Sequence, residues 1–313
     1  MSTTLAAPAV PQQRRRAGRR PGGPTVSRPG FAWALPATLF FGLFAIVPLV
    51  LVVVLSFTSW AGLGDPEFVG LANWQRLARD PVMLNSLWLS VLLTALGVLV
   101  QTPLSLLIGV WAAGHQRNRA VLSAIFFLPL LLSATAVSVL WRALLDPNFG
   151  VPGQAGWLFG DGNLFGTRTG AIGVLVFVSS WQFIPFHALI YQGAARAVPA
   201  VLYQAAEVDG AGRWGQFRHV TLPQLRNAMI TSVVLMVVGG LTMFDTVLIL
   251  TQGGPGTDTT ITAYYMYEQA FRSFDFGAGA AIALLLVVVA TVISLIVVRA
   301  SGYDKMRSTM EGL

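Results

Sequence analysis

This sequence is short of charge. Only 11% of its 313 residues are charged, 55% are hydrophobic, and the mean hydropathy is +0.67. A soluble domain usually carries about 25% charged residues, so the chain has too few charges to cover a surface that faces water. The composition excludes an ordinary soluble domain and predicts a protein that crosses the membrane several times.

Cysteine is absent altogether, which excludes disulfide bonds, thiol catalysis and cysteine-ligated metals. The three histidines, His115, His187 and His219, lie far apart and show no metal-ligand spacing. Lys305 is the one lysine among 20 basic residues, an arginine bias that fits a GC-rich genome. The chain also lacks a Gly-x4-Gly-Lys-Ser/Thr loop, the nucleotide-binding loop of many ATPases.

Long apolar runs are plentiful. A helix needs about 20 apolar residues to cross the hydrocarbon core, and prolines are tolerated where neighbouring helices satisfy the freed backbone groups. The sequence therefore predicts an all-α membrane protein with six transmembrane helices. The qualifying stretches are 31–58, 86–112, 120–141, 170–192, 228–251 and 277–298.

The basic residues are distributed unevenly between the connecting segments. The two terminal tails and the segments 113–119 and 193–226 hold 15 of the 20, and the alternate segments hold the other five. Because basic residues concentrate on the cytoplasmic side, both termini and the 193–226 segment are predicted to be cytoplasmic.

This topology gives three regions. Residues 1–30 form an arginine-rich tail, 31–300 the six-span domain, and 301–313 a second cytoplasmic tail. The first tail is open to two interpretations, a nucleic-acid patch or a disordered topogenic segment attracted to anionic lipid. The second is favoured, because the tail is rich in Pro and Gly and directly precedes a span, so no nucleic-acid partner is expected. The first apolar run is also too long for a cleaved signal peptide.

A polar, helix-compatible stretch over 200–225 interrupts the apolar sequence, within a cytoplasmic segment 196–225. Pro199 suits a helix start, and Gly210 and Gly212 permit a turn with positive φ. A second short helix is expected over 213–220, and Pro223 ends the polar segment. The stretch is therefore predicted to be a bent helix pair.

The spacing within this stretch is specific. Gln204-Ala205-Ala206, three residues, Gly210, nine residues and Val220-Thr221-Leu222-Pro223 resemble the Glu-Ala-Ala…Gly…Ile-x-Leu-Pro signature of permease subunits of binding-protein-dependent ABC importers. Thr251-Gln252-Gly253-Gly254-Pro255, followed by Thr259, resembles an element of the carbohydrate-importer branch, of the maltose and glycerol-phosphate type. The resemblance covers about residues 30–300.

The resemblance implies the six-helix architecture of an ABC type I importer permease in a bacterial cell membrane, with no cofactor, no metal and no catalytic residue of its own. It implies a second, homologous permease, a cytoplasmic ATPase dimer and an extracytoplasmic binding protein as partners. The helix pair would dock in a cleft of the ATPase through Gln204, Ala205, Ala206, Glu207, Asp209, Gly210, Leu222 and Pro223.

One residue departs from the signature, since Gln204 replaces its leading Glu. Glu207 lies about one helical turn further on, on nearly the same face, and can substitute for that charge. The alternative for the whole segment is an amphipathic helix in the headgroup layer, with Arg213 and Arg218 on lipid.

Polar residues inside predicted spans are candidates for the substrate path. Asp245 lies about 9 Å from the outer end of the fifth span, either facing a water-filled cavity or buried and paired. Gln182 and His187 raise the same question, and a histidine bonded to a neighbouring helix is favoured.

Three aromatic residues, Trp181, Phe186 and Phe244, fall near positions that line the sugar cavity in the resembling family, and aromatic faces suit pyranose rings. Packing or lipid contact is the alternative for them. Gly277 and Gly279 resemble a small-residue surface for close helix contact.

Three functions can be considered for a protein that spans the membrane several times. The favoured one is a sugar importer subunit, whether for an oligosaccharide, a disaccharide or a sugar derivative. A stand-alone ion-coupled secondary transporter is the alternative, although one acidic residue within six spans is poor provision for ion coupling. An intramembrane enzyme would need a catalytic constellation that the sequence does not contain.

Overall fold

The computed structural model describes residues 33–114, 124–154 and 162–300. The chain divides into two units, one ending at Pro48 and one beginning at Leu49, and each is considered by itself. Both predicted tails, at 1–30 and 301–313, and His115 lie outside the described residues.

The first unit is apolar helix. It contains α1 (Leu35–Phe41), the π-helical turn η2 (Gly42–Ile46) and the start of α2 (Val47–Leu55). The helical run from Leu35 to Leu55 is 21 residues long with a mean hydropathy of 2.9, and none of its most apolar stretch is buried. A helix therefore forms within the first predicted span, 31–58.

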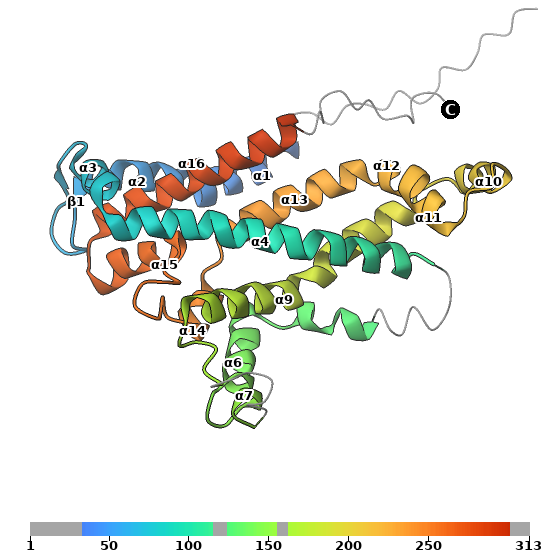
Figure 1. The fold of residues 1–313 in the computed structure, drawn as a ribbon. Helices are drawn as coiled ribbons and strands as arrows, with labels where there is room; N and C mark the ends of the chain where they lie inside the picture. Colours follow the sequence, from blue (N-terminus) through green and yellow to red (C-terminus); the bar gives the residue numbers. More distant parts are fainter. Residues whose placement is uncertain (1–32, 115–123, 155–161, 301–313) are drawn as a thin grey trace, which may run out of the picture. The chain divides into compact units, whose positions relative to one another are not determined.

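Three long helices dominate the second unit: α4 (Pro81–Ala112), α9 (Arg168–Arg196) and α16 (Phe276–Ala300), with 32, 29 and 25 residues. At about 1.5 Å per residue each exceeds the roughly 30 Å hydrocarbon core. The helices predicted at 86–112, 170–192 and 277–298 are thus confirmed (Figure 1). The Asp80 carboxylate caps α4 by accepting from the Val82 N–H at 2.9 Å, and Thr167 caps α9 in the same way.

The third predicted span is not one helix. A 3₁₀ turn, η3 (Leu128–Leu131), precedes α6 (Ala134–Leu144), and Leu132 between them is extended. Pro129 lacks an N–H, and the Ser133 hydroxyl caps α6 by accepting from the Ala136 N–H. Hydropathy does not register these signals, so a continuous helix over 120–141 was the wrong prediction.

The fifth predicted span, 228–251, is also broken. It consists of α13 (Arg226–Leu241) and α14 (Asp245–Leu250), separated by residues 242–244. Phe244 has φ −131° and ψ −57°, which no helix continues through. The Thr242 hydroxyl donates back to the Val238 carbonyl at 2.8 Å, and the Thr242 N–H donates to the same oxygen at 3.1 Å, where α13 ends.

Short elements gather at the two ends of the long helices. One end carries β1 (Thr58–Ser59), paired antiparallel with β2 (Glu67–Phe68), as well as α3 (Ala72–Arg79), α15 (Thr262–Tyr267) and the π-turn η5 (Glu268–Arg272). The other end carries α10 (Ala200–Val208), α11 (Arg213–Gln216), η4 (Phe217–Thr221) and α12 (Leu222–Gln224). Figure 1 shows α3 and α15 near one end of α4 and α10 beyond the other. A single turn, α7 (Val151–Gln154), follows α6.

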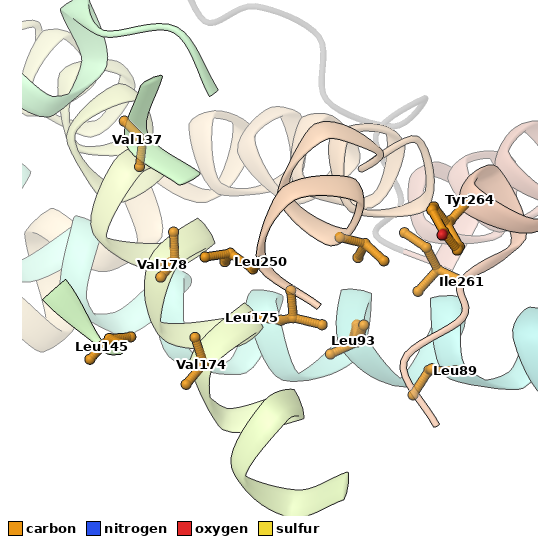
Figure 2. Packing of buried hydrophobic residues seen from close by; sticks show 11 residues of the cluster. Leu89, Leu93, Val137, Leu145, Val174, Leu175, Val178, Leu250, Ile261 and Tyr264 are labelled. Carbon is orange, nitrogen blue, oxygen red and sulfur yellow. The ribbon is translucent and has the colours of Figure 1, made fainter. Parts of the chain in front are cut away.

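The main core of the second unit joins the long helices to the broken ones. Figure 2 shows α4 and α9 contributing leucines and valines that meet residues from α6, α14 and α15. At the other end of α4, Gln192 of α9 donates to the Ala112 carbonyl at 2.8 Å. The core side chains are Leu89, Leu93, Val137, Leu145, Val174, Leu175, Val178, Val247, Leu250, Ile261 and Tyr264.

The start of α16 fits closely against the chain around β1. A Cβ at Gly277 would lie 2.0 Å from the Thr58 carbonyl oxygen and 3.0 Å from the Asn73 amide nitrogen. Asn73 is buried and donates to the carbonyls of Ser56 and Thr58 at 3.1 and 2.8 Å. A Cβ at Gly279 would lie 2.7 Å from the Cβ of Ala270. The small-residue surface predicted at these glycines exists, although their partners are β1, α3 and η5.

We predict that Gly277→Ala destabilises the protein by about 1–3 kcal/mol, because the new methyl group has no room beside the Thr58 carbonyl. Thermal unfolding in detergent measures the loss. Gly193→Ala is the matched control, because Gly193 lies in a helix with nothing within 4 Å of its added Cβ. Equal melting temperatures for the two variants would contradict the close fit at Gly277.

Candidate functional site

The polar stretch at 200–225 forms the predicted helix pair. Helix α10 begins after Pro199 and ends at Val208, with Asp209 as its C-cap, and Gly210 follows with φ +77°. The Ala211 N–H donates to the Ala206 carbonyl at 2.8 Å and the Gly210 N–H to the Glu207 carbonyl at 3.0 Å. This pair of bonds is a Schellman motif, which needs a left-handed residue at the position of Gly210. Backbone hydrogen bonds between residues of the Ala-Ala…Gly pattern therefore form the turn at Gly210.

The second part of the pair runs through α11, the π-turn η4 and α12, and it meets α13 at a bend of 66°. The Tyr203 hydroxyl lies 3.0 Å from the hydroxyl of Thr221, which is buried, and so joins α10 to η4. Leu222 packs against the buried Leu106, Tyr191 and Leu225. The helix pair is therefore anchored to α4, α9 and α13.

Most of the predicted coupling residues face outward. Gln204, Ala205, Glu207 and Asp209 are exposed, and Ala206 is half-buried. Among the described residues, the side chains of Gln204, Glu207 and Asp209 form no hydrogen bond or ion pair. Leu222 points inward instead, whereas Pro223 is exposed. The outward set is free to meet a partner.

Three exposed apolar residues of the segment were missed by the sequence analysis. Val201, Val208 and Trp214 are 63%, 89% and 69% exposed. Val201, Ala205 and Val208 share a helix face, at spacings of four and three residues, and the Trp214 ring stacks on Phe217 with centroids 5.4 Å apart. Contiguous exposed apolar surface marks an interaction site. The helical spacing of the valines was the available signal.

A cavity of about 510 Å³ lies between α4, α9, α13 and α14. Its wall is mostly apolar, and a small number of polar groups interrupt it, as is typical of small-molecule sites. Three residues that the sequence assigns to a substrate path, Phe186, Phe244 and Asp245, line this cavity. The principal polar lining residues are Thr94, Gln101, Ser179, His187, Asp245 and Thr246.

Trp181 and Gln182 do not line the cavity. Trp181 packs edge-on against Trp141 with centroids 5.4 Å apart, and the Gln182 amide donates to the Leu132 carbonyl at 3.2 Å. Helical periodicity explains the difference, because the cavity face of α9 follows Ser179, Phe183 and Phe186 at spacings of four and three residues.

Asp245 is the first residue of α14 and is exposed. Its carboxylate has no hydrogen-bond or ion-pair partner among the described residues, so within this chain the aspartate is neither buried nor paired. Gln101 lies on the same cavity with 8% exposure, and its side-chain amide likewise bonds to no described residue. The cavity thus holds an acceptor and an amide that are both available to a polar ligand.

His187 serves the helix packing, as the sequence analysis favoured. Its Nδ1 lies 2.9 Å from the Ser232 hydroxyl of α13, and both side chains are buried. This contact fixes α9 against α13 at the edge of the cavity.

The Thr-x-Gly-Gly-Pro…Thr element follows the C-terminal end of α14. The Thr259 hydroxyl lies 2.7 Å from the Gly254 carbonyl oxygen and 2.8 Å from the Thr251 hydroxyl. Gly253 has φ +81°. The two threonines therefore fold the glycine loop back on the helix that carries Asp245.

The comparisons with known proteins agree with this geometry. The family model described as binding-protein-dependent transport system inner membrane component matches residues 105–301. A probable ABC transporter permease protein of Pyrococcus horikoshii is 34% identical over 273 residues, which cover 83% of this chain and 91% of that protein. The multiple sugar-binding transport system permease protein MsmF of Streptococcus mutans is 30% identical, covering 82% of this chain and 93% of its own.

The fold also matches a solved structure. A chain of a bacterial ABC transporter involved in the import of the acidic polysaccharide alginate superposes with a TM-score of 0.76 and 21% identity, covering 87% of this chain and 94% of that one. At this identity the likeness concerns the fold. The family match and the Pyrococcus relative carry the assignment: the chain belongs to the family of binding-protein-dependent transport system inner membrane components.

Proposed function

We propose that this protein is a permease subunit of an ATP-binding-cassette importer that carries a sugar into the cytoplasm. The observation that carries the proposal is the exposed helix pair at 200–225, which is anchored to the helices that line a cavity. Relatives named as permeases for multiple sugars and for arabinooligosaccharides support a carbohydrate as the substrate.

The proposed topology has six crossings with both termini in the cytoplasm of a bacterial cell. The first, second, fourth and sixth crossings are residues 35–55, α4, α9 and α16. The segment of η3 and α6 forms the third crossing, and α13 together with α14 forms the fifth. The distribution of basic residues supports this orientation. So does the placement of α10 and α3 at opposite ends of α4 (Figure 1).

The helix pair is proposed to dock on a cytoplasmic ATPase dimer. The Val201, Ala205 and Val208 face supplies apolar contact, and Glu207 and Asp209 supply negative charge for basic groups of the ATPase. Gln204 contributes a hydrogen bond in place of the usual ion pair. A hydrophobic centre with a polar rim is typical of protein interfaces.

The cavity is proposed to hold one part of the sugar during transport. Asp245 and Gln101 offer an acceptor and an amide to hydroxyl groups, and Phe186 and Phe244 offer aromatic faces. A second, homologous permease would complete the path, and an extracytoplasmic binding protein would deliver the sugar.

We predict that Gly210→Ala lowers ATP-driven sugar uptake by about 5- to 30-fold in the reconstituted transporter. Alanine in the left-handed conformation costs about 1–2 kcal/mol. This cost lowers the equilibrium population of the helix pair in its docking geometry by about 5- to 30-fold. Nothing lies within 4 Å of the added methyl group, so the effect comes from the backbone alone.

Gly212→Ala is the matched control, because Gly212 also has free space but a φ of −67°. Its uptake should equal that of the unmodified protein. Equal uptake by both variants would show that the Schellman turn does not matter for coupling.

We predict that Asp245→Asn lowers uptake about tenfold or more, because a hydrogen bond to a charged group contributes about 1.5–3 kcal/mol. ATPase activity stimulated by the loaded binding protein should stay near that of the unmodified transporter. Asp258→Asn, an exposed aspartate 3.8 Å from Arg168 and away from the cavity wall, is the control.

The same assay separates the importer from an ion-coupled transporter. If the subunit by itself accumulated sugar under an ion gradient without ATP, and Asp245→Asn abolished that accumulation, the importer proposal would be wrong.

A further inference from the structure

Five aromatic side chains form a continuous series of ring contacts at the end of the second unit that carries α15. The centroid distances are 5.4 Å from Trp60 to Phe276, 5.8 Å from Phe276 to Phe271, 5.6 Å from Phe271 to Tyr267 and 5.3 Å from Tyr267 to Phe244. We call these five residues the outer aromatic row. It ends on the cavity, because Phe244 lines the cavity wall.

The row is accessible along its length. Phe271 is 58% exposed, and Trp60, Tyr267, Phe276 and Phe244 are half-buried. Rings that served only to fill a core would be buried, as Tyr264 is beside them with 0% exposure. The row therefore presents ring surface to the outside while its neighbours hold it in place.

Polar groups with planar geometry flank the row. The Arg272 guanidinium carbon lies 5.8 Å from the Tyr267 ring centroid and 5.9 Å from that of Tyr264, and its Nη1 is 3.5 Å from a Glu268 carboxylate oxygen. Arg272 and Glu268 thus place five N–H donors and a carboxylate beside the rings. Ring faces with such groups at their edge suit a ligand that has apolar faces and a rim of hydroxyl groups, and a pyranose has this shape.

We propose that the outer aromatic row is a binding track for the pyranose units of an uncharged oligosaccharide, leading from the extracytoplasmic surface to the cavity. This inference rests on the proposed function. One feature favours a sugar over lipid as the occupant: the series is continuous with a cavity that contains Asp245 and Gln101.

Leucine variants test the row, because leucine keeps the apolar volume and removes the ring face. Phe271→Leu and Tyr267→Leu should each lower uptake of a neutral gluco-pentasaccharide by about three- to tenfold in the complete reconstituted transporter. Phe271→Trp and Tyr267→Phe should retain uptake, since they keep a ring. Glucose, which occupies one position at a time, should be affected less than the pentasaccharide.

Phe274→Leu is the matched control. Phe274 lies just after η5, is 62% exposed and belongs to no ring pair among the described residues, so its replacement should leave uptake unchanged. Equal losses for Phe274→Leu and Phe271→Leu, or normal uptake by Phe271→Leu, would overturn the track and point to a general lipid or packing role.

A binding measurement separates failure of the track from failure of the proposed function. Saturation-transfer NMR on the transporter in nanodiscs should show transfer from aromatic protons to the pentasaccharide, and Phe271→Leu with Tyr267→Leu should reduce it. Absence of a difference between this double variant and the unmodified protein overturns the track. Absence of ATP-driven uptake of any saccharide by the unmodified transporter overturns the proposed function.

Discussion

The structure depends on satisfying backbone polar groups where helices stop inside an apolar chain. Lipid offers no hydrogen bonds, so each unpaired N–H or C=O at membrane depth costs several kcal/mol. Arg142 at the end of α6 meets this requirement for α14, because its Nη1 donates to the Ile249 carbonyl at 2.6 Å. Gln192 does the same for the end of α4, and Ser133 for the start of α6. Two of these side chains, Arg142 and Ser133, therefore support the ends of the broken helices.

The breaks in turn create the functional geometry. The interruption at residues 242–244 turns the chain so that Asp245 begins a new helix on the cavity wall. A continuous helix over 228–251 would place this residue within a helical hydrogen-bond ladder. Arg142 and the loop closed by Thr251 and Thr259 then hold α14 in position. Helix termini at a cavity are the arrangement that membrane transport sites commonly use.

Mechanical continuity links the other end of the molecule to the same cavity. The Schellman turn at Gly210 fixes the angle between α10 and α11, and the contact of Tyr203 with Thr221 joins α10 to the path toward α13. Helix α13 both lines the cavity and bonds to α9 through Ser232 and His187. A displacement of α10 would therefore be transmitted to the cavity wall through packed side chains and not through a flexible linker.

The sequence predicted much of this structure but not its interruptions. The long helices follow from apolar length, and the turn at Gly210 follows from glycine spacing, because both signals are local. The breaks at Leu132 and Phe244 were missed, because caps such as Ser133 lie within runs whose hydropathy does not fall. Trp181 and Gln182 were assigned to the path although the cavity face of α9 follows Ser179 and Phe186, and that face depends on how three helices are rotated together. The local sequence of one helix does not predict how that helix is rotated relative to its neighbours.

ATP is proposed to act on the cavity through the 200–225 segment. Since the chain contains no cysteine, Thr242→Cys places a single thiol of this subunit on the cavity wall, at an exposed position beside the break. The rate at which a water-soluble thiol reagent modifies it should be measured in the complete transporter with and without ATP. ATP should change the rate, and adding Gly210→Ala should remove most of the change. An ATP response that Gly210→Ala leaves intact would show that the 200–225 segment does not couple ATP to the cavity.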